Sequence, residues 1–471
     1  MRSTRAMRST WRFHASILAA LALLIAACGG DGAATTTTAD SSGTTAATTT
    51  TEASTETTEA PTETTASGEP IVFASSLPLT GEFSIPGTKH RDGYQMCVDQ
   101  INARGGLLDR QVELLVEDNR SDSEVAVTQY ERFITVENVD MLFGTFSSLL
   151  TFPTSAVAEQ NGMVYPVPSG AAQRIWERGF ENLFYFQQKP AEETNKTIIN
   201  MLNYYVEQGI APALPATAAI VYGDDFFAAA IANGFLGGEV VAPDGTVLAD
   251  LSPGGLADAG IELVLEEQYP AGFTDWLTLA NSIADSGAEF LSISTASPDE
   301  AISLIRALQT VGYQPPFVYA SQGAQVEFLD NLGDAVNGVA IHTVWHPSIE
   351  FVGLLGGEEY TNAQFIADFE SAFGRAPDED EAIPFAVCQG MEQAIAGAGT
   401  TDNAAVAQWL RERTADDPVR TVIGDFNWDE RGLPIGRDFL VNQWQDSVLE
   451  FVYPVGEFPG TTDLIYPKPE W

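Results

Sequence analysis

Apolar and polar positions change their period repeatedly along the chain between residues 71 and 321. Short apolar runs such as IVFASSLPL and QVELLVED predict buried strands, and RDGYQMCVDQINARGG, whose apolar residues lie three or four apart, predicts a helix. The alternation forms two successive series, from IVFASSLPL to MVYPVPS and from AAIVYGD to PPFVYAS. Strands that alternate with helices of about 10–15 residues are typical of βαβ units. We therefore expect an α/β fold with two parallel sheets.

The pattern changes after GVAIHTVWHP, which ends at Pro347. Apolar periodicity predicts three consecutive helices over residues 360–373, 381–396 and 403–413. A strand-rich tail then follows, with the segments GDFNWDERG, RDFLVNQWQ and LEFVYPV. A tail of strands after a helical block suggests that the chain returns to complete an earlier sheet.

The first 27 residues combine a basic start with a short apolar run. Four arginines precede the apolar run ASILAALALLIAA. The run is shorter than the ~20 apolar residues that a membrane-spanning helix needs, so it predicts a secretion signal over residues 1–27. The run ends in IAAC at Cys28, which resembles the lipobox of bacterial lipoproteins. This resemblance implies that Cys28 carries a diacylglycerol and anchors the protein to the outer face of the cell membrane.

A Thr-rich tract separates Cys28 from the predicted globular part. Residues 28–69 show no apolar periodicity and few large side chains, so they predict a disordered linker. The whole chain has a formal net charge of −43. Such an acidic chain repels nucleic acid, which we exclude as a partner. The one acidic run, DEDE at 378–381, predicts a solvated loop.

Two cysteines remain once Cys28 is assigned to lipid. Cys97 and Cys388 both lie in helical patterns, and an exported protein is exposed to oxidising conditions. A disulfide between them and two separate buried thiols fit the sequence equally well.

Several motifs resemble the type 1 periplasmic binding proteins, in the branch that binds branched-chain amino acids and amides for ABC importers. They are SLPLTG, DGYQMCVDQINARGGLLDRQVELLVEDNRSD, MLFGTFSSLLTFPTSAVAEQNGMVYPVPSG and GDFNWDERG, in this order. The resemblance implies two Rossmann-like lobes joined by a three-stranded hinge, with a small solute held in the cleft between them (a Venus-flytrap). The first lobe is expected at 70–187 and 346–423, and the second at 188–345 and 424–471. It also implies a monomer that needs no cofactor and delivers solute to an ABC permease and ATPase.

Two serines follow a predicted strand and precede a helix in GTFSSLLTFP. Free N–H groups at a helix start, together with a hydroxyl, suit a carboxylate. The family resemblance assigns the carboxylate contact to Ser148, with Ser147 beside it. A helix N-cap is the structural alternative for this position, and the two roles are compatible.

Other family positions depart from the pattern of amino-acid binders. Ser169, Gly170 and Ala171 match a loop that holds the ligand, but an alanine replaces the expected threonine. Phe227 matches a position often held by a covering tyrosine. Gln322 replaces the glutamate that usually binds the ligand's ammonium group, and a neutral amide cannot supply that countercharge.

Aromatic residues suggest an apolar wall for the expected cleft. Phe83, Phe227 and Trp345 are the candidates, with core packing as the alternative for each. Trp345 is expected at a lobe crossing, where it would stack on a ring. Together with the departures above, this favours a small carboxylate or amide, including aromatic ones, over an amino acid, which is the second hypothesis.

The sequence does not favour a metal site or an enzyme. His342 and His346 are four residues apart, but they lie in a predicted strand and hinge, so we expect no metal. The sequence contains no G-x-S-x-G, P-loop or G-x-G-x-x-G motif, and we expect no enzyme. A sensor subunit that reports ligand to a signalling system is the alternative function.

Overall fold

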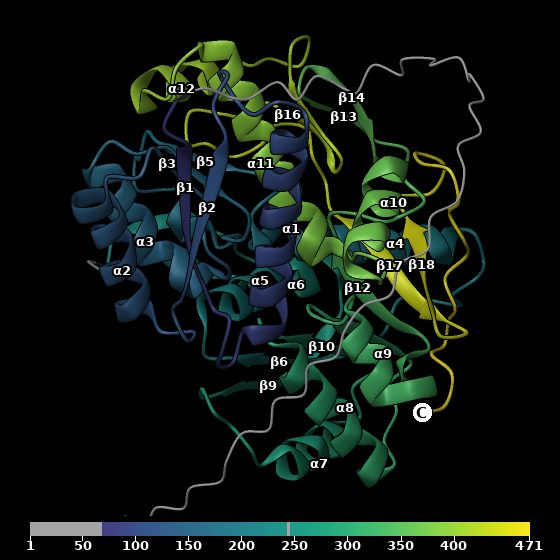
Figure 1. Ribbon diagram of the computed structural model, residues 1–471. Coiled ribbons are helices and arrows are strands. Elements are labelled where there is room, and N and C mark those ends of the chain that lie inside the picture. The colour runs from purple at the N-terminus through teal and green to yellow at the C-terminus, as the bar shows by residue number, and fades with distance from the viewer. Residues whose placement is uncertain (1–67, 243–244) are drawn as a thin grey trace, which may run out of the picture. The chain divides into compact units, whose positions relative to one another are not determined.

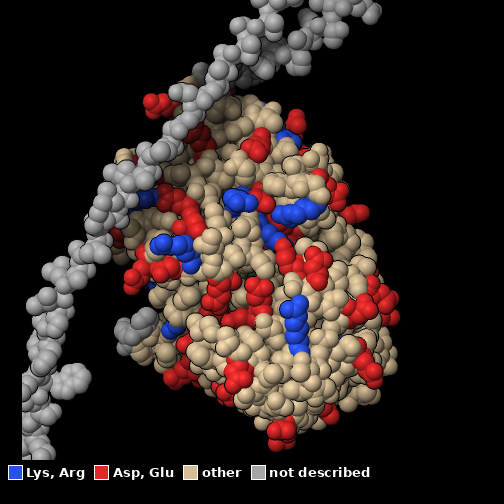
Figure 2. Space-filling model, turned by 60° about the horizontal axis from the view of Figure 1, so that its bottom comes forward, with Lys and Arg blue, Asp and Glu red and all other residues tan. Residues whose placement is uncertain are grey.

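The computed structural model describes residues 68–242 and 245–471 of the chain (Figure 1). The predicted signal over 1–27, the lipidation of Cys28 and the linker up to residue 67 lie outside the described residues. Within the described ranges, no helix combines the length and apolar character needed to cross a membrane. Acidic side chains are spread over the face shown in Figure 2, with basic side chains between them.

The first sheet is parallel and has β1 at its centre. β1 (Ile71–Leu77) pairs with β2 (Val112–Asp118) on one side and with β3 (Met141–Leu142) on the other. Alternate residues of β1 face opposite sides, as a strand requires. Phe73 packs in the cluster that contains α1 (Ser84–Ala103), and Ala74 packs in the one that contains Tyr130 of α2 (Ser123–Arg132).

Three further pairs of short strands accompany this sheet. β4 (Tyr165–Val167) and β5 (Leu183–Tyr185) are parallel and follow α3 (Ser148–Gln160). The antiparallel pairs are β13 (Val352–Leu355) with β14 (Glu358–Thr361), and β15 (Val419–Thr421) with β16 (Gly424–Phe426).

The second sheet has seven strands in the order β18-β17-β12-β11-β10-β6-β9. Its parallel strands are β6 (Thr217–Gly223), β9 (Glu262–Tyr269), β10 (Phe290–Ser294), β11 (Phe317–Ala320) and β12 (Val339–Thr343). The strand-rich tail supplies β17 (Leu440–Gln445) and β18 (Val448–Tyr453), and β17 runs antiparallel to β12. A small antiparallel pair, β7 (Glu239–Val241) with β8 (Val247–Asp250), lies outside this sheet.

Helices cover both faces of the second sheet. Ile220 of β6 packs in the cluster of α4 (Thr194–Glu207), α5 (Phe226–Leu236) and α6 (Gly255–Ala259). Val221 packs in the cluster of α7 (Trp276–Ser286), α8 (Pro298–Val311) and α9 (Val326–Leu332). Three connections lead between the short strand pairs and the second half of the fold: residues 186–193 link β5 to α4, 344–351 link β12 to β13, and 427–439 link β16 to β17.

The three helices predicted after residue 360 are present. They are α10 (Asn362–Phe373), α11 (Glu379–Ala398) and α12 (Asn403–Arg411). Strand β9 was not predicted, because its sequence ELVLEEQY carries three glutamates and does not alternate cleanly. It lies at the edge of the sheet, where charged side chains face solvent and discourage pairing with another chain.

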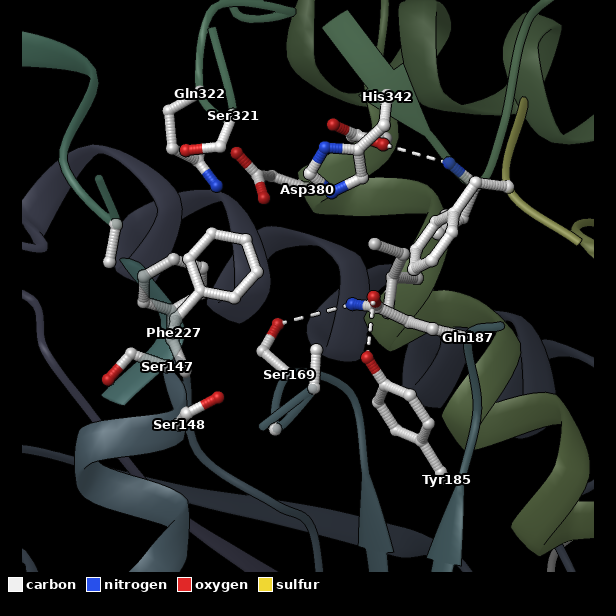
Figure 3. Close-up of a pocket in the computed structure, with 18 residues that line it drawn as sticks. Ser147, Ser148, Ser169, Tyr185, Gln187, Phe227, Ser321, Gln322, His342 and Asp380 are labelled. Carbon is white, nitrogen blue, oxygen red and sulfur yellow. Dashed lines mark hydrogen bonds between the residues drawn. The ribbon is translucent and has the colours of Figure 1, made fainter. Parts of the chain in front are cut away.

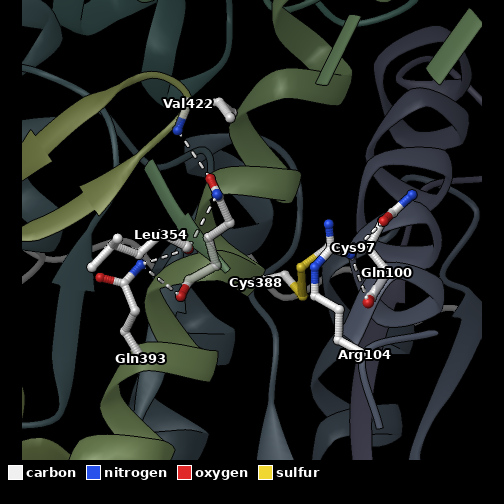
Figure 4. The surroundings of a disulfide bond; sticks show 8 residues. Cys97, Gln100, Arg104, Leu354, Cys388, Gln393 and Val422 are labelled. Atoms are coloured by element: carbon white, nitrogen blue, oxygen red, sulfur yellow. Dashed lines mark hydrogen bonds between the residues drawn. A yellow bond between two sulfur atoms is a disulfide. The ribbon is translucent and has the colours of Figure 1, made fainter. Parts of the chain in front are cut away.

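Two features of α11 differ from, or add to, the expectations. The acidic run 378–381 is not a solvated loop: Asp378 caps the helix, and Asp380 and Glu381 in its first turn are buried. Cys388 forms a disulfide with Cys97 of α1 (Figure 4). Of the two alternatives that the sequence left open, the structure has the bonded one.

Candidate functional site

One cavity is lined by segments that follow strands of both sheets (Figure 3). Its empty space, counted out to the solvent at its mouth, is ≈ 560 Å³. Its lining residues are Phe146, Ser147, Ser148, Ser169, Gly170, Ala171, Tyr185, Gln187, Phe227, Ala296, Ser321, Gln322, His342, Val344, Glu379, Asp380, Ile383 and Phe439. Seven of the nine sequence-based candidates are among them.

The serine end of the cavity is the start of α3. Ser147 is the N-cap, and its hydroxyl accepts a hydrogen bond from the backbone N–H of Leu150 at 3.3 Å. Its backbone has φ 72° and ψ 151°, a region that only glycine adopts without cost. The Ser148 hydroxyl accepts from the Ala172 N–H at 3.1 Å, so its own hydrogen is available to a ligand. The start of α3 can therefore offer donors to a carboxylate.

The loop at Ser169–Ala171 is already held by the protein. Its three carbonyl groups accept hydrogen bonds from the Thr151 hydroxyl, from the Trp176 indole N–H and from the Ala191 backbone N–H. Each carbonyl oxygen keeps one lone pair for a ligand. The loop is therefore a rigid wall of the cavity.

Polar side chains fix the orientation of the Ser169 hydroxyl. His90 Nε2 lies 3.1 Å from Ser169 Oγ, and the Gln187 amide donates to the same oxygen at 3.5 Å. Gln187 in turn accepts from the Tyr185 hydroxyl at 2.9 Å. Burial lowers the pKa of His90 to about 4, so the ring is neutral at physiological pH. We infer that this group adds no positive charge to the cavity.

An acidic end is formed by the first turn of α11. The Asp380 side chain is 5% exposed, and its Oδ2 accepts from the Gln325 amide at 2.8 Å. Glu379 Oε2 accepts from the Thr343 hydroxyl at 2.6 Å and from the Val344 N–H at 3.2 Å. Burial, and then the charge of Asp378, raises the pKa of Asp380 to about 7. Burial, and then Asp380, raises the pKa of Glu379 to about 8.

The nearby basic groups are paired with other acids. Lys89 lies 2.8 Å from Glu327 of α9 and also pairs with Asp378. Burial alone would lower the pKa of Lys89, but Asp378 and the other carboxylates around it raise it well above its ordinary value. Among the described residues, neither Glu379 nor Asp380 takes part in an ion pair. The charge of Lys89 favours the ionised form of Asp380, but it is shared among several carboxylates.

Aromatic rings form the wall near His342. The ring centres of Phe227 and Phe439 lie 6.1 Å and 5.1 Å from that of His342. Burial lowers the pKa of His342 to about 4, and its Nδ1 is 2.7 Å from the Tyr319 hydroxyl. The wall is thus neutral and partly apolar.

Two sequence-based candidates do not line the cavity. Phe83 packs behind it, with its ring centre 5.9 Å from that of Phe146. Trp345 lies in a second cavity with Trp444 and Leu449, and its indole donates to Asn362 at 2.7 Å. His342 and Val344 line the first cavity, whereas Trp345 faces the other way. Trp345 therefore lines a different cavity from the seven candidates named above.

The main residues that sequence reasoning missed are Asp380 and Glu379. A signal for them was present, because Asp378 followed by Glu381 three positions later is a capping-box pattern. The structure has that capping box: Asp378 accepts from the Asp380 N–H, and Glu381 accepts from the Asp378 N–H. Tyr185, Gln187 and Phe439 carried no comparable signal.

The chain is similar in sequence to known solute-binding proteins. The profile of the family described as "Periplasmic binding protein" matches residues 70–447. Leu/Ile/Val-binding protein homolog 7 of Brucella suis is 25% identical over 393 residues, which are 82% of this chain and 91% of that protein. An "Amino acid binding protein" of Pseudomonas aeruginosa is 23% identical over 383 residues, covering 80% of this chain and 91% of its own length.

Solved structures share the fold at low sequence identity. The branched-chain amino acid transporter substrate-binding protein LivJ of Streptococcus pneumoniae, in complex with isoleucine, has a TM-score of 0.66 at 17% identity. It covers 82% of this chain and 100% of its own. A solute-binding protein of an ABC transporter from R. palustris, in complex with benzoate, has a TM-score of 0.62 at 15% identity and covers 85% and 98%.

Proposed function

The chain belongs to the periplasmic binding protein family, and on this premise we propose that it captures a small carboxylate-bearing solute outside the cell and delivers it to an ABC permease. The proposal includes the lipid anchor at Cys28, which would keep the binding domain near the membrane that holds the permease. The relatives named above support an amino-acid-like solute.

One observation carries the proposal. The cavity is lined by Ser147 and Ser148, which follow the first sheet, and by Ser321 and Gln322, which follow β11 of the second sheet. A solute held there touches both halves of the fold. We propose that the lobes 70–187 with 346–423 and 188–345 with 424–471 close on the solute by hinge motion, a common mode of ligand-driven domain closure.

Titration calorimetry with the purified protein tests the carboxylate contact. Each ligand that binds would be measured against wild type and Ser148→Ala. Losing a hydrogen bond to a charged group weakens binding by about 1.5–3 kcal/mol, which is roughly 10-fold or more. Ser282→Ala in α7, which does not line the cavity, is the matched control. Equal affinities for wild type and Ser148→Ala would contradict the role of Ser148.

A further inference from the structure

The acidic end of the cavity holds two carboxyl groups that form no ion pair among the described residues, although the charge of Lys89 acts on Asp380. Asp380 accepts one hydrogen bond at Oδ2, and no described residue donates to its Oδ1. Lys89 is engaged by Glu327 and Asp378, and Arg375 is engaged by Asp92 and Glu381. Burying a charge without a partner is costly unless something else compensates it.

The acceptors around Asp380 outnumber the donors. The Gln325 amide gives its N–H groups to Asp380 and to Gln322 Oε1, both at 2.8 Å. Gln325 is 1% exposed, and its own Oε1 has no hydrogen-bond partner. This part of the protein therefore combines a buried carboxylate with an unsatisfied buried amide oxygen beside it. Of the two, Asp380 lines the cavity, and a group with several N–H donors and a positive charge matches its carboxylate.

We propose that Asp380, with Glu379 beside it, binds an ammonium group of the solute, so that the solute is a small zwitterion rather than a simple carboxylate or neutral amide. The inference rests on the proposed function, since it uses the same cavity. The carboxylate of the solute lies at the start of α3, and its ammonium lies at the start of α11. The first turn of α3 thus binds the carboxylate of the ligand with N–H donors. The first turn of α11 binds the ammonium group of the same ligand with its carboxylates.

This assignment changes what the neutral side chain of Gln322 implies about the ligand. A neutral side chain at that position led us to disfavour amino acids, because the expected countercharge was missing. In the structure Gln322 lines the same cavity as Asp380 (Figure 3). The Gln325 amide links the two side chains by hydrogen bonds. The countercharge is therefore supplied by a different element of the fold, 58 positions later in the chain.

Matched ligand sets test the inference on the intact wild-type protein. Calorimetry would compare leucine with 4-methylpentanoate and 3-methylbutylamine, and phenylalanine with 3-phenylpropanoate and 2-phenylethylamine. We expect at least one amino acid to bind at least about 30-fold more tightly than its deaminated acid, because removing one partner of a buried charged pair has effects of this size. Equal or tighter binding of the deaminated acid would overturn the inference and leave the proposed function intact.

Asp380→Asn supplies the second arm, and Asp99→Asn on the exposed face of α1 is the control for a lost charge. We expect Asp380→Asn to weaken amino-acid binding about 10-fold or more and to leave binding of a deaminated acid unweakened. Equal loss for both ligands would overturn the inference, because it would indicate general damage to the cavity. The wild-type comparison stands even if the variant folds poorly.

Proton release gives an independent readout near pH 7. The groups that face Asp380 are Lys89 of α1, Glu327 of α9, neutral His342 of β12 and the neighbouring acids Asp378, Glu379 and Glu381. An arriving ammonium lowers the pKa of the carboxyl groups that it contacts. Calorimetry in phosphate and in Tris should show protons released to the buffer by wild type and a smaller release by Asp380→Asn. Proton uptake by wild type would contradict the proposal.

Discussion

Asp380→Asn should stabilise the ligand-free protein at pH 8, although it removes a residue that we place in the binding cavity. Asp380 is buried and has only one hydrogen-bond donor, and Asp378 lies on the same helical turn. Its negative charge is therefore unfavourable until a ligand arrives. Asparagine has the same shape and no charge, so the ligand-free fold loses a repulsion and keeps its packing.

The magnitude follows from the raised pKa. The pKa of Asp380 moves from 3.8 to about 7 on folding. At about 1.4 kcal/mol per unit, the ionised carboxylate costs the fold up to roughly 4 kcal/mol. Between about pH 4 and pH 7 the folded protein keeps a proton that the unfolded chain has released, so the free energy of unfolding falls as pH rises. The raised pKa of Glu379 acts in the same direction.

Urea unfolding at pH 5 and pH 8 measures this effect after bound solute is removed by denaturation and refolding. We expect Asp380→Asn to exceed the stability of wild type by a smaller margin at pH 5 than at pH 8, with Asp99→Asn unchanged at both. A variant that is no more stable than wild type at pH 8 would refute the reasoning. It would mean that Asp380 is compensated by a contact that the structure does not show.

Three further predictions concern other parts of the fold. Ser147→Gly should raise the free energy of unfolding by about 1 kcal/mol, because it relieves a backbone conformation that costs about 1–3 kcal/mol, whereas Ser147→Ala should lower it; equal values for the two would contradict this. Replacing Cys97 and Cys388 by serine should lower the free energy of unfolding by about 3–5 kcal/mol. Urea unfolding without reductant measures this change. Trp345→Phe should leave ligand affinity unchanged in calorimetry but cost about 1–3 kcal/mol of stability, since the buried Asn362 loses its donor; a large loss of affinity would return Trp345 to the binding site.

Much of the fold could be predicted because hydrophobic period and helix length carry its main signals. The helices at 84–103 and 362–411 and the strands at the centres of both sheets follow from apolar positions that face a core. Strand β9 escaped this reasoning because an edge strand carries charge where a central one does not. The spacing of apolar residues predicts an element that packs against the protein core. The same signal is weak for an element that faces solvent.

The site was predictable where it follows local rules. Ser147, Ser148 and the loop at Ser169 lie directly after strands of a parallel sheet, and this position is readable from the chain. Asp380 was not readable in this way, because a carboxylate in a charged run looks solvated until tertiary packing buries it. Whether Gln322 leaves the cavity without a countercharge depends on Asp380, which belongs to another segment. That a carboxylate in one segment replaces a charge missing from another can be seen only in the three-dimensional structure.

The Cys97–Cys388 bond spans 291 positions and so closes a covalent ring. That ring contains every strand of the second sheet except β17 and β18. A protease that cuts once inside the ring, at an exposed connection between these strands, produces two fragments that remain joined. Their junction is the pair of helices that carries Lys89 and Asp380, so both sides of the ligand cavity stay on one covalent particle. Outside the cell, where surface loops are cut and not replaced, a nicked molecule can keep its two halves together.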